Sequence, residues 1–335
     1  MPCRLPYRSF PFCRPLRVLV ALAISAPALP AAAAAPSSAA GCISNVIVTS
    51  SADSGTGSLR PAVAGLCNGG RIRFANRAVI ELASEIAIDK QVTIDGSSVA
   101  QDASAGDAAL VWIRGRSGVR SFRVSAAGDL TLRSLRISDG ATADLGGGVR
   151  SSGRLAVFDS RLGHNTAGNI GGGAIFNELN GVLVVDGCLF DANDAQRGSA
   201  IFNSGTAQIG NTTFSGNGPV LQREGAIQNR GTLNAVHVTI AHNGNNGGFG
   251  GLFAFGADTT LINSVFADNT GTQCGISGGT VAAIALLAPG AGCQSTVSGD
   301  PRLAPLAANG GSTLTHALVE GDAAECAIES RQPAH

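Results

Sequence analysis

The chain contains little charge and almost no lysine. Of its 335 residues, 14% are charged, against about 25% in a typical soluble domain, and its 23 basic and 23 acidic residues balance. Lys90 is the only lysine. No basic stripe exists that would neutralise phosphates, so nucleic acid is excluded as a partner. After residue 35 no apolar run is long enough for a membrane helix, and no integral membrane segment is expected there.

The first 35 residues have the pattern of a signal peptide. Arginines precede a short apolar run, Val18 to Leu29, and alanines 31–35 offer small-residue cleavage sites. The apolar run is too short, and too interrupted by proline, to span a bilayer well. An uncleaved anchor is the alternative. We therefore expect a protein that is exported and is either secreted or held at the cell surface, where association with an outer membrane would fit.

Export changes what the cysteines imply, because disulfides persist outside the cytoplasm. No Cys-x-x-Cys pair or nearby histidine pair gives a zinc spacing, so no metal site is expected. We predict two disulfides, Cys42 with Cys67 and Cys274 with Cys293, one at each end of the repeat region. The pairing state of Cys188 and Cys326 stays open.

A repeat of about 26 residues runs through the middle of the chain. An apolar residue is followed three positions later by asparagine, and these asparagines are Asn165, Asn193, Asn217, Asn243 and Asn269. A second marker keeps the same period: GGV at 147–149, GGA at 172–174, GSA at 198–200, EGA at 224–226 and GGL at 250–252. Two independent markers with one period indicate stacked structural repeats.

Each period also contains alternating apolar residues, which is typical of a β-strand. If one period is one turn of chain, each residue lies about 4.8 Å above its counterpart, at strand-pairing distance. We therefore predict an all-β fold, a single-stranded right-handed parallel β-helix. The asparagines are expected to form a hydrogen-bonded ladder inside the coils. Ligand binding is the alternative role for them.

Both ends of a β-helix expose strand edges and need caps. Residues 42–125 are expected to form an N-terminal cap, with a helix that begins near Ser58, and the first irregular coils. Regular coils are expected over 126–273. Residues 274–335 are expected to form the C-terminal cap region, in which Ile284 to Leu287 could form a final strand and the loop-rich residues 294–335 pack over the last coil.

Three motifs resemble known bacterial surface proteins. Residues 48–75 resemble the N-terminal cap of secreted right-handed β-helix proteins with a GSLR-type motif, although Pro61 replaces the expected Gln or Glu. The Gly-Gly-Ala-Ile and Phe-x-x-Asn repeats resemble those of polymorphic outer membrane proteins. DPRLAPLAANGGSTLTHAL at 300–318 resembles the choice-of-anchor Q region. The resemblance implies a pectate-lyase-like fold and a surface or extracellular location, but no single activity.

Charged residues gather on two adjacent predicted coils. Two apolar repeat residues, Ile137 and Leu162, each have an arginine one position before them and a polar residue two positions after them. These four residues, Arg136, Arg161, Asp139 and His164, are expected to be neighbours on the outer surface. They are the candidates for chemistry, and ordinary surface salt bridges are the alternative. Asp186, Asp191 and Asp194 form a loose acidic group that could contact Ca²⁺.

Two hypotheses on function follow. The first is a non-catalytic, adhesin-like or glycan-binding protein whose partner is an extracellular glycan or a host or cell surface, with no cofactor. The second is a polysaccharide lyase or glycoside hydrolase that uses the outer flank of the β-helix, with Ca²⁺ as cofactor if it is a lyase. Because fold alone does not establish chemistry, the first is favoured.

Overall fold

The structure is a computed structural model. It describes residues 41–99, 111–116, 118–168, 171–220, 224–244, 248–289, 292–293, 295–297 and 299–319. The expected signal peptide and Cys326 lie outside these residues. In this part of the chain, no helix combines the length and apolarity needed to cross a membrane.

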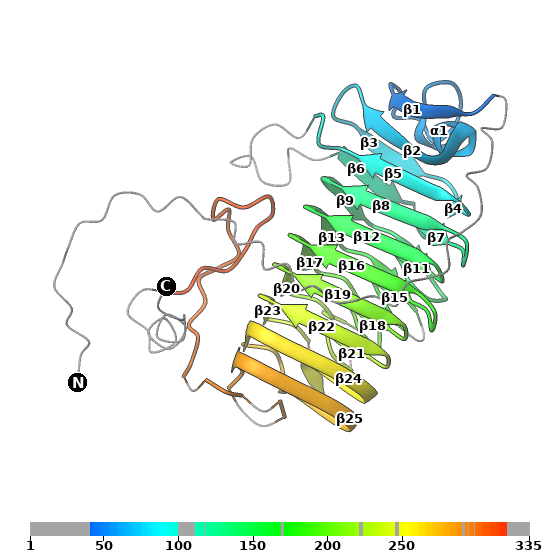
Figure 1. Ribbon diagram of the computed structural model, residues 1–335. Coiled ribbons are helices and arrows are strands. Elements are labelled where there is room, and N and C mark those ends of the chain that lie inside the picture. Colours follow the sequence, from blue (N-terminus) through cyan, green and yellow to red (C-terminus); the bar gives the residue numbers. More distant parts are fainter. Residues whose placement is uncertain are drawn as a thin grey trace, which may run out of the picture. The chain divides into compact units, whose positions relative to one another are not determined.

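The described chain winds into an all-parallel β-helix of about nine coils, which confirms the predicted fold class. Three parallel sheets run along it (Figure 1). The first sheet contains β1 (Ile43–Val48), β2 (Leu66–Phe74), β5 (Gln91–Asp95), β8 (Asp129–Arg133), β12 (Arg154–Phe158), β16 (Val182–Asp186), β19 (Thr206–Gly210) and β22 (Thr232–Val236).

The second sheet contains β3 (Val79–Leu82), β6 (Val111–Gly115), β9 (Leu135–Ser138), β13 (Arg161–Gly163), β17 (Leu189–Asp191), β20 (Thr213–Ser215) and β23 (Thr239–Ala241). The third contains β4 (Ile86–Ile88), β7 (Phe122–Val124), β11 (Val149–Ser151), β15 (Ile175–Asn177), β18 (Ile201–Asn203) and β21 (Ile227–Asn229). The long strands β24 (Phe249–Ala267) and β25 (Thr272–Leu287) extend all three sheets, and β10 (Ala141–Thr142) pairs separately with β14 (Thr166–Ala167).

Identical or similar side chains stack in the core because successive coils pair in register. Phe190 pairs with Phe214, and their rings are stacked with centroids 4.9 Å apart. Both rings are fully buried, as are Leu162 above them and Phe266 below. A single coil cannot cover such residues, so stacking supplies the core.

The predicted asparagine ladder is present and spans five coils. Asn165 Nδ2 donates to Asn193 Oδ1 at 3.0 Å, and the same contact repeats through Asn217, Asn243 and Asn269. Each Oδ1 below also accepts the backbone N–H of the asparagine above it. Gln273 ends the ladder, since its Oε1 accepts from Asn269 Nδ2 at 2.6 Å. The ladder therefore satisfies buried backbone groups at a turn.

Two further columns of residues occupy left-handed turns on either side of the second sheet. The column after the strands contains Asp139, His164, Ala192, Gly216, His242 and Asp268, and the column before them contains Ser134, Asp159, Gly187, Asn211, His237 and Asn263, all with φ between 46° and 65°. Asn, Asp, His and Gly tolerate this conformation best, which explains why polar side chains recur there. These turns place polar groups along the outer edge of the coils.

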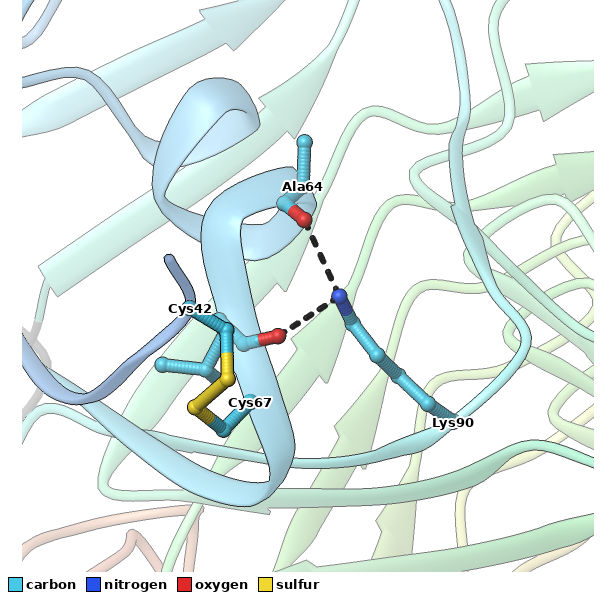
Figure 2. The surroundings of a disulfide bond; sticks show 5 residues. Cys42, Ala64, Cys67 and Lys90 are labelled. Atoms are coloured by element: carbon cyan, nitrogen blue, oxygen red, sulfur yellow. Dashed lines mark hydrogen bonds between the residues drawn. A yellow bond between two sulfur atoms is a disulfide. The ribbon is translucent and has the colours of Figure 1, made fainter. Parts of the chain in front are cut away.

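The N-terminal end is closed by the predicted helix and disulfide. Helix α1 (Leu59–Gly65) follows Ser58 and buries Leu59, Ala62 and Val63. The Cys42–Cys67 disulfide joins the residue before β1 to β2 (Figure 2). Lys90 Nζ donates to the carbonyls of Ala64 and Leu66 at 3.0 and 2.7 Å. The sole lysine thus places a cation at the carboxyl end of the helix, where the helix dipole favours it.

The C-terminal residues differ from the expectation that they pack over the last coil. Among the described residues after Leu287, the segment up to Val297 does so: Cys293 is bonded to Cys274 as predicted, and Val297 pairs with Leu287. Residues 302–319 form an antiparallel hairpin, here called the C-terminal hairpin, with hydrogen bonds between Ala307 and Thr315. It lies along the side of earlier coils, because Ser312 hydrogen-bonds to Asp159 and His316 to Ser215.

Candidate functional site

The outward side chains of β3, β6, β9, β13, β17, β20 and β23 form one continuous surface, here called the flank. Register places its central row in the order Val79, Trp112, Arg136, Arg161, Leu189, Thr213 and Thr239. Arg136 and Arg161, two of the residues singled out in the sequence, are thus direct partners on adjacent coils. Asp139 and His164 occupy the turn that follows each of these strands.

The charged groups of these four residues do not converge on one another. Arg161 Nε donates to Asp191 Oδ1 at 2.7 Å, and its Nη2 donates to the other oxygen. The two side chains are only 14% and 11% exposed, so this ion pair belongs largely to the interior. Asp139 pairs instead with Arg114, and Arg136 lies against Trp112. His164 is exposed at its turn.

Two of the residues predicted from the sequence, Arg136 and Asp139, lie in a group around the only tryptophan of the chain, which the sequence did not single out. The guanidinium carbons of Arg114 and Arg136 lie 4.8 and 4.1 Å from the centroid of the Trp112 ring. The indole Nε1 donates to Ser138 Oγ. Arg114 also pairs with Glu81 and Asp139, both at 3.3 Å. We call Glu81, Trp112, Arg114, Arg136 and Asp139 the Trp112 cluster.

The Trp112 cluster combines the groups that recognise polar ring-shaped ligands. Trp112 and Arg136 are partly exposed, and the side chains of Arg114 and Asp139 are 35% and 32% exposed. An aromatic face with fixed donors and acceptors beside it suits a ligand that has one apolar face and several polar groups.

Further along the flank, the C-terminal hairpin closes the surface. Leu189, Thr213 and Ser215 point outward in alternation with core phenylalanines, yet all three are buried. Hairpin residues reach the turns at this level: Ser312 Oγ donates to Asp159 Oδ1 at 3.1 Å, and Thr313 Oγ1 donates to the Gly187 carbonyl at 3.3 Å. The flank changes here from charged to small and apolar residues, which explains why a chain segment covers this part.

His316 fastens the hairpin to the coils. Its Nδ1 lies 2.7 Å from the Ala304 carbonyl, so Nδ1 carries the proton, and Nε2 can accept from Ser215 Oγ at 2.9 Å. Partial burial lowers the pKa of His316 below its usual value, and the neighbouring His242 acts in the same direction. The Ala304 carbonyl and Asp268 oppose this shift.

Acidification is expected to loosen the C-terminal hairpin. Because docking lowers the pKa of His316, the detached hairpin binds a proton more readily, and docking weakens as the pH falls below about 6.5. Hydrogen exchange of residues 302–319 should be faster at about pH 5 than at about pH 8, relative to the intrinsic rates. His316→Gln should remove most of this difference. Equal protection of the hairpin at both pH values in the unaltered chain would contradict the assignment.

The acidic residues that the sequence grouped as possible Ca²⁺ ligands do not form a metal site among the described residues. Asp186 accepts from Asn211 Nδ2 at 2.8 Å, and Asp191 belongs to the pair with Arg161. Across the described residues, no three His, Cys, Asp or Glu side chains are placed to hold one metal ion. Cys188 is unpaired and buried, and burial raises the pKa of its thiol to about 12, which leaves it unreactive.

Comparison with known proteins adds no closer assignment. No family model matches the chain, and a search of curated proteins finds no match.

Proposed function

We propose that this chain is exported and acts outside the cell as a non-catalytic, adhesin-like β-helix that binds a glycan through the Trp112 cluster. The observation that carries the proposal is the position of the only tryptophan, outward on a rigid coil with two guanidinium groups against its ring. The exposed part of the indole can contact the apolar face of a sugar, while Arg114 and Asp139 can hydrogen-bond its hydroxyl groups.

The extracellular location is supported by separate features. The N-terminal sequence has the pattern of a signal peptide, and the two disulfides would persist in an oxidising compartment. The similarity of residues 48–75 and 300–318 to surface β-helix proteins favours the same location. Polymorphic outer membrane protein-like repeats and a choice-of-anchor Q region remain part of this proposal.

Binding is favoured over catalysis by the way the candidate groups are engaged. A lyase of this kind would usually need free carboxylates to hold Ca²⁺, and a hydrolase would need two free carboxylates that face one sugar bond. Arg161 instead holds Asp191 in a largely buried ion pair, and Asp139 is held by Arg114. This arrangement gives a fixed recognition surface with its acids already neutralised.

A glycan array compared between variants tests the proposal. Wild-type protein should bind a defined subset of glycans, and Trp112→Ala should lose at least about fivefold in affinity for them, taking about 1–3 kcal/mol for a ring stacked on an aromatic side chain. Phe158→Ala is the matched control, since Phe158 also faces outward beneath an arginine, Arg133, at 4.6 Å.

The two variants must first be shown to keep the far-ultraviolet circular dichroism of the wild type. An array on which the wild type binds no glycan would overturn the proposed function. Equal losses of glycan affinity in Trp112→Ala and Phe158→Ala would show that the binding surface is not the Trp112 cluster.

A further inference from the structure

Arg136 stands apart from the other arginines in the central part of the flank. Arg114 is neutralised by Glu81 and Asp139, and Arg161 is neutralised by Asp191. Arg136 makes no hydrogen bond or ion pair with any residue that the structure describes, and its one specific contact is with the Trp112 ring. Its guanidinium is therefore a fixed cation whose donors are unused.

Burial makes the lack of an acceptor at Arg136 costly. The Nε atom is buried and has no acceptor within the described structure. A buried donor that lacks an acceptor loses hydration without compensation, and such groups call for a specific explanation. A water molecule could satisfy one donor, but it would leave the charge without a counter-ion.

Charge around Trp112 is also unbalanced. Among the described residues, Arg114, Arg116 and Arg136 lie with two carboxylates, those of Glu81 and Asp139, which leaves one positive charge. The two carboxylates lie with Arg114 and Arg116, so the excess is located at Arg136.

We propose that Arg136 receives the carboxylate of an acidic sugar whose ring stacks on Trp112, an inference that rests on the proposed glycan binding. The terminal nitrogens of a guanidinium form a planar fork that matches both oxygens of a carboxylate. A neutral hydroxyl would accept one of these N–H groups and leave the charge in place. The ligand class is therefore a carboxylate-bearing glycan, such as a polyuronate.

Isothermal titration calorimetry with paired probes tests the inference. The probes are uronic-acid oligosaccharides (galacturonate, glucuronate and mannuronate) and the same oligosaccharides with their carboxylates reduced to alcohols. For at least one pair, the wild type should bind the carboxylated form at least about tenfold more tightly, the usual worth of a charge-assisted hydrogen bond. This preference should shrink with added salt, because the site is partly exposed to solvent.

Arg136→Gln should abolish the preference for the carboxylated form, so that both forms of each pair bind with similar affinity. Arg133→Gln is the matched control, because Arg133 also lies over an aromatic ring, 4.6 Å from that of Phe158, but on the first sheet. It should keep the wild-type preference.

The outcomes separate this inference from the proposed function. If the wild type binds reduced and carboxylated forms equally, the acidic ligand is refuted while glycan binding stands. If sulfated glycans without carboxylates bind more tightly than every uronate, and Arg136→Gln removes that binding, the carboxylate is the wrong anion. If no glycan binds on the array or in the calorimeter, the proposed function fails as well.

Discussion

Replacing Asn217 with alanine is expected to lower the free energy of unfolding by about 3–5 kcal/mol. Asn217 lies in the middle of the ladder, fully buried, and its Oδ1 accepts both the backbone N–H and the Nδ2 of Asn193. Its Nδ2 donates to the Phe190 carbonyl and to Asn243 Oδ1, both at 2.9 Å. Alanine removes all of these contacts and leaves buried backbone groups without partners, each at a cost of about 1–3 kcal/mol.

Chemical denaturation followed by circular dichroism measures this loss. Asn234→Ala is the control, because Asn234 lies on β22 of the coil below, outside the ladder and half-buried. It should change stability by less than about 0.5 kcal/mol. Similar effects of the two substitutions would show that the ladder does not stabilise the coils.

The second large effect is expected for Arg161. Arg161→Met should destabilise the protein by about 3 kcal/mol, because it leaves the carboxylate of Asp191 largely buried without its cation. Arg136→Met, on the adjacent coil and in register with it, should cost no more than about 1 kcal/mol, since only its contact with Trp112 is lost. Thermal unfolding of the two variants measures the contrast.

This contrast distinguishes a structural arginine from a ligand-binding one. Arg161→Met should leave the glycan preference of the remaining folded protein intact at low temperature, whereas Arg136→Met should change it. If Arg161→Met instead left stability unchanged and abolished binding, Arg161 would belong to the ligand-binding site, as the enzyme hypothesis requires.

The periodic part of the fold was predictable because one coil constrains the next. A residue such as Phe190 must stack on Phe214, and each ladder asparagine must meet another, so the two markers recur at a nearly constant spacing. The disulfide pairings followed from the position of the cysteines at either end of the repeat, and both are present.

Trp112 was missed because its coil does not carry the repeat markers. β6 follows a stretch of small and polar residues and precedes the first Phe-x-x-Asn copy, so periodicity gave no sign of a coil there. One signal was available: Val111, Ile113 and Gly115 alternate with Trp112 and Arg114, as in a strand with one buried face. Register with Arg136 could not be inferred without that strand.

The place of the C-terminal hairpin was also not predictable from local pattern. Its contacts join residues about 100 or more positions apart, such as Ser215 and His316, and Asp159 and Ser312. Leu189 is an apolar residue in an outward row where polar residues are expected, and it is buried together with Thr213. Those residues needed a cover, but the sequence did not indicate which segment supplies it.

The fluorescence of Trp112 during a glycan titration tests the central claim most directly, because the chain contains no other tryptophan. The account predicts that a glycan identified on the array shifts or quenches the emission, with a midpoint equal to the dissociation constant from calorimetry. Emission that stays constant while calorimetry shows saturable binding would contradict it, since the glycan would then bind away from Trp112.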